Sequence, residues 1–176
     1  SLGELAHGGR DAFYKGPIAA KIVAFSRGLG GTMTAEDLAD YSSEWVQPIS
    51  TTYHGWKVYE LPPNGQGIAA LMMLDIMERF PLAQYGHNSA DALHVMIEAK
   101  KLAYADLLRY VGDPRFSDIP VSAMLSKHYA GMRAELIDSA RANCNVVPGK
   151  PTLATTGDTT YLTAVDSQGN MVSLIQ

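Results

Sequence analysis

The sequence has a single cysteine, Cys144, among its 176 residues. One thiol can form neither an internal disulfide nor a thiolate metal cluster, and the asparagines on either side of it are typical of a loop. The histidines show none of the spacings of zinc ligands; they are His7, His54, His87, His94 and His128. We therefore expect no metal and no other cofactor.

Clusters of one charge and long apolar stretches are also missing. The formal net charge is −4, without any run of Lys and Arg, whereas nucleic acids and anionic membranes select clustered positive charge. No stretch approaches the ~20 apolar residues that a membrane span requires. We expect neither nucleic acid nor a membrane as the main partner, and the sequence leaves a cytoplasmic and a periplasmic location both open.

The two ends of the sequence are unusual for a complete protein. Position 1 is a serine, with no initiator methionine and no signal peptide after it. Residues 171–176 have the pattern of a strand, but no turn follows them. We therefore expect the chain to be a fragment of a longer protein.

Periodicity and capping signals predict that most of the chain is helical. Pro17 suits the first position of a helix, and Thr34 and Ser89 suit N-caps. The expected helices cover about residues 17–28, 35–41, 68–80, 90–111 and 121–137. In the longest helix we expect a buried face made of Leu93, Met96, Ile97, Tyr104, Leu107 and Leu108, with Ala92, Ala99 and Ala103 allowing close approach of a neighbour.

Two pairs of short β-runs predict two hairpins. Residues 46–53 and 56–61 flank His54-Gly55, a plausible two-residue turn. Residues 160–165 and 170–175 flank a second turn that ends at Gly169. Helices with two hairpins indicate the α+β class, as a mostly helical fragment.

Residues 139–157 have the composition of a loop and lead directly to Thr159. Long loops in compact proteins usually have a function, and both a cleavable linker and a merely disordered connector fit this one. A hydroxyl at the start of a strand becomes a nucleophile if the bond before it is cut, because the freed α-amine can act as its base. Threonines also begin ordinary strands, so the pattern alone leaves both roles open for Thr159.

The order of several motifs resembles the γ-glutamyltransferase family, also called γ-glutamyltranspeptidase or glutathione hydrolase. The motifs are Gly8-Gly9 with Phe13-Tyr14-Lys15-Gly16, Gly30-Gly31 with Thr34-Ala35-Glu36-Asp37-Leu38, Pro62-Pro63-Asn64-Gly65-Gln66-Gly67, Ala103-Tyr104-Ala105-Asp106, Tyr110-Val111-Gly112-Asp113-Pro114 and Gly157-Asp158-Thr159-Thr160. They span almost the whole chain, and the last one resembles the processing site of that family.

The resemblance implies an N-terminal-nucleophile hydrolase, an αββα sandwich whose precursor cuts itself before a threonine. Residues 1–158 would be the C-terminal part of the large-subunit-like region, and residues 159–176 the start of the small-subunit-like region. Autocleavage would break the bond between Asp158 and Thr159, and Thr159 would be the catalytic residue. The substrate would be a γ-glutamyl amide such as glutathione, and the remainder of the precursor would be the partner.

Two positions depart from the family pattern. Tyr161 stands where a histidine is frequent, and Thr163 stands where a serine is usual. The alternatives are therefore a related amidase or acylase of the cephalosporin acylase kind, with a non-glutamyl acyl group, or a non-catalytic helical interaction domain. The resemblance also implies that the substrate-binding arginine and the oxyanion-hole glycines lie outside these 176 residues, so we expect the isolated fragment to be inactive and uncleaved.

Overall fold

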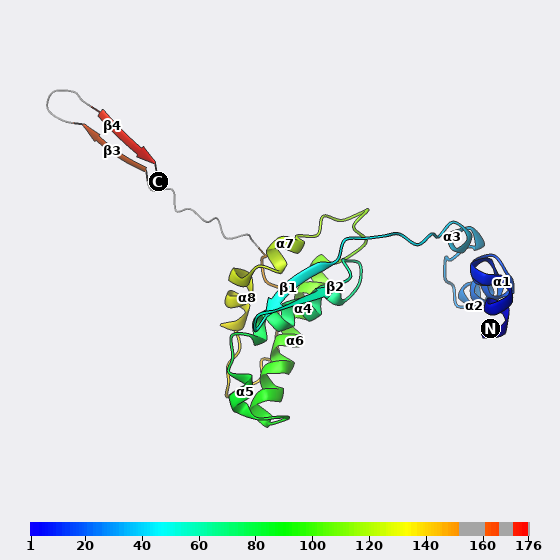
Figure 1. Ribbon diagram of the computed structural model, residues 1–176, viewed down its shortest axis with the longest axis horizontal. Helices are drawn as coiled ribbons and strands as arrows, with labels where there is room; N and C mark the ends of the chain where they lie inside the picture. The colour runs from blue at the N-terminus through cyan, green and yellow to red at the C-terminus, as the bar shows by residue number, and fades with distance from the viewer. Residues whose placement is uncertain (152–160, 166–170, 176) are drawn as a thin grey trace. The chain divides into compact units, whose positions relative to one another are not determined.

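The computed structural model describes residues 1–151, 161–165 and 171–175. The chain divides into two compact units, residues 1–45 and residues 46–176, whose elements are labelled in Figure 1. The described part contains no helix that is both long enough and apolar enough to cross a membrane.

The first unit consists of the helices α1 (Leu2–Tyr14), α2 (Pro17–Gly28) and α3 (Ala35–Ala39). Both predicted helices are present, and α2 begins at its proline as expected. A capping box begins α3, because Thr34 Oγ1 accepts a hydrogen bond from the Asp37 amide while the Asp37 carboxylate accepts one from the Thr34 amide. Helix α1 was not predicted, since glycines are poor helix formers and Gly9 interrupts this helix with φ 56° and ψ −146°.

Helix α4 (Gly67–Met77) lies at the centre of the second unit and contacts the hairpin, α6 and α8. Figure 1 shows it beside the hairpin of β1 (Ile49–Tyr53) and β2 (Trp56–Glu60) and beside the long helix α6 (Ala90–Tyr110). Six of its apolar side chains are buried, and they lie on several faces of the helix; they are Ile68, Ala69, Leu71, Met72, Ile76 and Met77. The short helix α5 (Leu82–Tyr85) connects α4 to α6.

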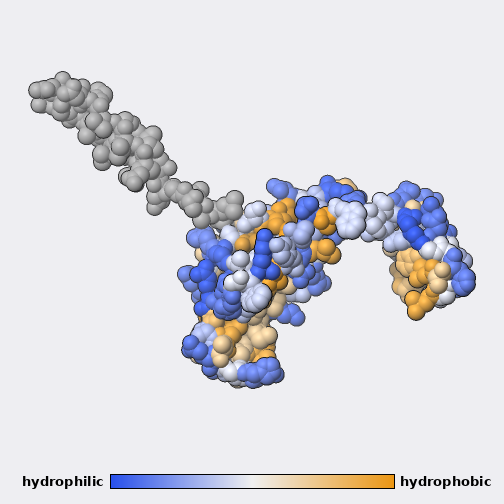
Figure 2. Space-filling model, viewed as in Figure 1, coloured by the Kyte–Doolittle hydropathy of each residue, from blue (hydrophilic) through white to orange (hydrophobic). Residues whose placement is uncertain are grey.

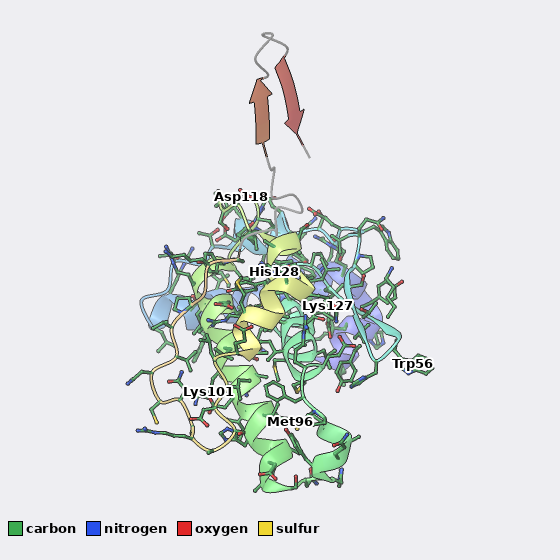
Figure 3. All side chains as sticks on the ribbon, turned by 90° about the vertical axis from the view of Figure 1, so that its left-hand side faces the viewer. Trp56, Met96, Lys101, Asp118, Lys127 and His128 are labelled. Atoms are coloured by element: carbon green, nitrogen blue, oxygen red, sulfur yellow. The ribbon has the colours of Figure 1, made fainter. Side chains whose placement is uncertain are left out.

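The first hairpin confirms the predicted turn. His54 has φ 46° and Gly55 has φ 85°, the left-handed conformations that a primed two-residue turn requires. The strands pair antiparallel from Tyr53 with Trp56 to Ile49 with Glu60, so β1 begins three residues later than predicted. Trp56, labelled in Figure 3, projects into solvent and is 78% exposed.

Helix α6 is present and capped as predicted, with Ser89 Oγ accepting from the Ala92 amide, but its predicted buried face is largely wrong. Leu93, Met96, Ile97 and Leu108 are 41%, 43%, 56% and 83% exposed, and Figure 2 shows hydrophobic residues at the surface around α5 and the adjoining end of α6. The buried positions are Ala92, Val95, Glu98, Ala99, Leu102, Ala103, Asp106 and Leu107. The alanines decide this orientation, because their small side chains let α4 approach closely.

The last predicted helix is divided into α7 (Val121–Met124) and α8 (Lys127–Ala134). Ser126 causes the break: its hydroxyl donates to the Ala123 carbonyl and accepts from the Tyr129 amide, which caps α8. A helix across residues 121–137 would leave no role for this cap.

The second hairpin pairs β3 (Tyr161–Val165) with β4 (Met171–Ile175) in antiparallel register, Tyr161 opposite Ile175. Both strands are where the sequence predicts them, and the turn with Gly169 lies outside the described residues. A mostly helical chain with two hairpins confirms the α+β class.

Candidate active site and the segment that leads to it

The two predicted site residues, Asp158 and Thr159, lie outside the described residues. The structure does describe how the chain is held before them. Buried polar and charged groups in the second unit bind the main chain of residues 143–149 and hold the first hairpin on α4; these groups are Thr51, Asp75, Glu98, Asp106 and Arg133.

Asp106 of α6 is the centre of the first cluster and is completely buried. Its Oδ1 accepts a hydrogen bond of 2.6 Å from the Gly149 amide, and its Oδ2 accepts one of 2.9 Å from the Tyr129 hydroxyl. Arg133 Nε lies 3.1 Å from the same Oδ2. The carboxylate therefore joins two helices to a loop residue that is 43 positions away in the sequence.

Arg133 of α8 also binds two main-chain carbonyl groups. Its Nη2 donates to the carbonyl oxygens of Leu102 and Val147, each at 3.1 Å. The Nε–H is at ion-pair distance from Asp106 but is not aligned for a hydrogen bond, so the contact between the two side chains is mainly electrostatic. The guanidinium thus connects α8 to α6 and to the chain before Gly149.

The main chain of Gly149 is bound through both its amide and its carbonyl, and side chains pack closely around its Cα atom. Besides the amide bond to Asp106, its carbonyl accepts a hydrogen bond of 2.7 Å from the Tyr110 hydroxyl. A Cβ atom added here would collide with the Tyr129 hydroxyl and would lie 3.0 Å from Tyr129 Cζ and 3.1 Å from Arg133 Cδ. Only glycine fits this close approach.

Glu98 provides a further attachment upstream. Its carboxylate accepts from the Asn143 amide at 3.3 Å and pairs with Lys101 at 2.6 Å. The chain is therefore held at Asn143, Val147 and Gly149, so the first part of the predicted loop of residues 139–157 is bound to the second unit. Across the described residues 139–151 composition correctly predicts the absence of helix and strand, but it does not reveal main-chain groups bound by buried side chains.

The electrostatics of the Asp106 cluster follow from its burial. Burial raises the pKa of Asp106, while the Gly149 amide, Arg133 and the Tyr129 hydroxyl act in the opposite direction. Burial, and then the neighbouring carboxylate, raise the pKa of Tyr129. The partners of Asp106 are all donors, so the ionised carboxylate is the form that satisfies them.

A second cluster centres on Asp75 of α4. Its Oδ1 accepts from Thr51 Oγ1 at 2.5 Å and from Lys127 Nζ at 2.7 Å. Lys127, which is labelled in Figure 3, also donates to Glu78 and to the Thr52 carbonyl. This ammonium group therefore ties β1, α4 and α8 together.

Burial raises the pKa of Asp75, against the hydrogen bonds from Lys127 and Thr51. Burial lowers the pKa of Lys127, but its bonds to Asp75 and Glu78 outweigh this, and the net direction is upward. Asp75 Oδ2 has no hydrogen-bond partner. The arrangement fits a structural ion pair that fixes the hairpin.

Two hollows at the surface involve polar residues. A cavity of 380 Å³ is lined by Leu136, Asp138 and residues 141–145, including the exposed Cys144. A cavity of 270 Å³ is lined by Tyr85, Asp91, His94, Val95 and Ser139. Within the described ranges no three or more His, Cys, Asp or Glu side chains gather in a way that could hold a metal ion.

Sequence reasoning assigned no role to Asp75, Lys127 or Arg133, and it named Asp106 only as part of a family motif. A partial signal exists for Asp106, since it falls on the same helical stripe as Ala99, Leu102 and Ala103 and is a carboxylate among apolar neighbours. Its partner at position 149 could not be predicted, because the contact joins distant parts of the chain.

The whole chain matches a known family. The family model described as Gamma-glutamyltranspeptidase covers residues 1–176. The glutathione hydrolase proenzyme of Escherichia coli (strain K12) is 41% identical over 177 aligned residues, which are 99% of this chain and 30% of that protein.

Two solved structures share the fold. The cephalosporin acylase from Bacillus halodurans aligns with a TM-score of 0.68 and 41% identity over 98% of this chain and 30% of its own. The Helicobacter pylori γ-glutamyltranspeptidase aligns with a TM-score of 0.69 and 29% identity over 89% of this chain and 46% of its own. The chain spans about a third of the length of the curated relatives that it matches.

Proposed function

The chain belongs to the γ-glutamyltranspeptidase family of enzymes, and on this premise we propose that it is part of a self-processing precursor whose nucleophile is Thr159. The observation that carries the proposal is the motif Gly157-Asp158-Thr159-Thr160, at the end of a series of family motifs in a chain that matches the family over its whole length. The proenzyme name of the E. coli relative supports a maturation step. The likeness in fold to a solved γ-glutamyltranspeptidase supports placing the chain in an αββα sandwich.

Maturation would use the same hydroxyl as turnover. Thr159 Oγ attacks the carbonyl carbon of Asp158, the acyl group passes from nitrogen to oxygen, and water hydrolyses the resulting ester. The products are a carboxylate at Asp158 and a free α-amine at Thr159. Residues 1–158 then form the C-terminal part of the large-subunit-like region, and residues 159–176 form the start of the small-subunit-like region.

In the mature enzyme the α-amine would take the proton of Thr159 Oγ as the oxygen attacks a γ-glutamyl amide. The amine of the substrate leaves with that proton, and the γ-glutamyl group is held as an ester on Thr159 Oγ. The acyl group then passes to water or to an acceptor amine, and the Thr159 hydroxyl is restored with the proton of that nucleophile. The reference pKa of an α-amine is about 8, so we expect kcat/KM to fall as the pH drops below that region and the amine becomes protonated.

The decisive experiment is expression of the full-length protein and N-terminal sequencing of its products. We expect a new terminus that begins Thr-Thr-Tyr-Leu, together with hydrolysis of a γ-glutamyl anilide. Thr159→Ala should abolish both, Thr159→Ser should retain measurable cleavage because it keeps the hydroxyl, and Thr160→Ala is the matched control. An intact wild-type chain that is inert toward these substrates would favour a non-catalytic interaction domain.

A second candidate is an acylase with a non-glutamyl acyl group. The 41% identity to the Bacillus halodurans cephalosporin acylase favours it, as do the departures at Tyr161 and Thr163. Both enzymes would mature in the same way, so only turnover separates them. Higher kcat/KM for an N-acyl cephalosporin than for glutathione would establish the acylase.

A further inference from the structure

Four side chains enclose a single main-chain position upstream of the proposed cleavage site. We call Asp106, Tyr110, Tyr129 and Arg133 the Gly149 clamp. Asp106 binds the Gly149 amide at 2.6 Å and Tyr110 binds its carbonyl at 2.7 Å. Tyr129 and Arg133 occupy the space where a Cβ would lie. The main chain is therefore held by both of its polar groups and by shape.

This cluster is not what the stability of a protein core alone would favour. Asp106 and Arg133 are 0% and 4% exposed, and burying an ion pair usually contributes less to stability than apolar side chains of the same volume. In some proteins such buried polar groups select one arrangement of the chain among several. Here the arrangement that they fix is the position of Gly149, nine residues before Asp158.

We propose that the Gly149 clamp positions the precursor for self-cleavage and keeps the new carboxyl end of the large-subunit-like region attached at Gly149 afterwards. The inference rests on the proposed function, because it assumes cleavage between Asp158 and Thr159. Its members are positioning residues, since they touch neither substrate nor the reacting atoms. The length of the chain limits how far Asp158 can lie from Gly149, because nine residues span at most about 30 Å when extended.

The size of the effect follows from the length of the tether. Loss of the clamp includes loss of the bond from Arg133 to the Val147 carbonyl, so the nearest described attachment that remains upstream is the Asn143 amide on Glu98, 15 residues before Asp158. The effective concentration of the Asp158–Thr159 bond at the place where it is cleaved falls roughly as the −3/2 power of the tether length. Moving the attachment from Gly149 back to Asn143 therefore lowers this concentration about twofold. If the Asn143 contact is lost as well, the tether extends back to the end of α8, and the effective concentration falls about fourfold.

The test measures maturation of the full-length protein in a pulse-chase experiment. Gly149→Ala should slow the appearance of the Thr159 terminus about two- to fourfold, while kcat and KM per cleaved enzyme stay at wild-type values. Lys150→Ala is the matched control, since this neighbouring side chain is exposed, and it should mature at the wild-type rate. Tyr110→Phe removes only the hydroxyl bound to Gly149 and should slow maturation by a smaller factor.

Three results would overturn the inference. One is wild-type maturation of both Gly149→Ala and Tyr110→Phe; if the alanine variant does not fold, the Tyr110→Phe rate decides alone. Another is a lower thermal midpoint without any change in cleavage rate, which a purely structural cluster would give. The third is loss of amide-exchange protection across residues 143–149 on cleavage, measured against uncleaved Thr159→Ala. A wild-type protein that never cleaves would instead refute the proposed function.

Discussion

The carboxylate of Asp75 is completely buried and accepts a hydrogen bond of 2.7 Å from Lys127, which is 52 residues away in the sequence. The same Asp75 oxygen binds Thr51 of β1. One ion pair therefore holds together the hairpin, α4 and α8, and its two members are not equivalent: the lysine is 38% exposed and the aspartate is not exposed at all.

Lys127→Met should destabilise the protein by about 1–3 kcal/mol, because it leaves a buried carboxylate without its cation; the partial exposure of the lysine keeps the cost below that of a fully buried pair. Urea unfolding of the full-length protein measures it, with Lys21→Met at an exposed site of α2 as the control. Equal unfolding midpoints for the two variants would contradict a role for this pair.

The same variant should become less stable as the pH rises. The pKa of Asp75 is already raised by burial, and loss of Lys127 raises it further. A folded state with a raised carboxyl pKa binds more protons than the unfolded state, so the penalty is absent below the unfolded pKa and grows as pH rises towards the folded pKa. Unfolding midpoints of wild type and Lys127→Met, compared between pH 4 and pH 8, should diverge with rising pH.

Removal of the charge from Asp75 should partly rescue the lysine variant. In Asp75→Asn with Lys127→Met no buried charge remains at position 75, so the double variant should lose less stability than the sum of the two single ones, by about 1 kcal/mol or more. A double-mutant cycle from urea unfolding gives this coupling energy. Additive effects would mean that the contact contributes nothing.

Ala103 is fully buried where α6 packs on α4, in a cluster with Ile68, Ala69 and Met72. Ala103→Leu should cost about 1–3 kcal/mol, because the added atoms have no space between the helices. Leu102→Met, at the adjacent buried position, conserves volume and should cost less than about 1.5 kcal/mol. Thermal unfolding of the two variants tests which face of α6 is buried, and tolerance of leucine at position 103 would refute the observed packing.

Asp113, in the turn after α6, should titrate far below an ordinary aspartate. The hydrogen bonds from the Arg115 side chain and amide lower its pKa to about 2. Because the ionised form is favoured in the folded state, its contribution to stability is present above the unfolded pKa and is lost as the pH falls towards 2. A carboxyl NMR titration should show this value in the wild type and a higher one in Arg115→Ala; an unchanged value would exclude the arginine as the cause.

Local signals in the sequence predicted the parts of the fold that depend on nearby residues. Examples are the proline that begins α2, the caps at Thr34 and Ser89 and the turn at His54-Gly55. Each of these signals acts on groups within four residues of it, so the interacting residues can be recognised together in the sequence. The split between α7 and α8 is also local, and the cap at Ser126 could have been recognised. The family resemblance depends on the order of such motifs, and it was visible for the same reason.

The sequence by itself determined the α+β class, most helix starts, both hairpins and the family. Only the tertiary structure decided which stripe of α6 is buried, since alanines and large apolar residues both follow the helical period and the neighbour selects between them. It also decided that Asp75 pairs with Lys127 and that Asp106 holds Gly149. Those contacts join residues dozens of positions apart, where hydrogen-bond geometry and desolvation, rather than pattern, determine which groups meet.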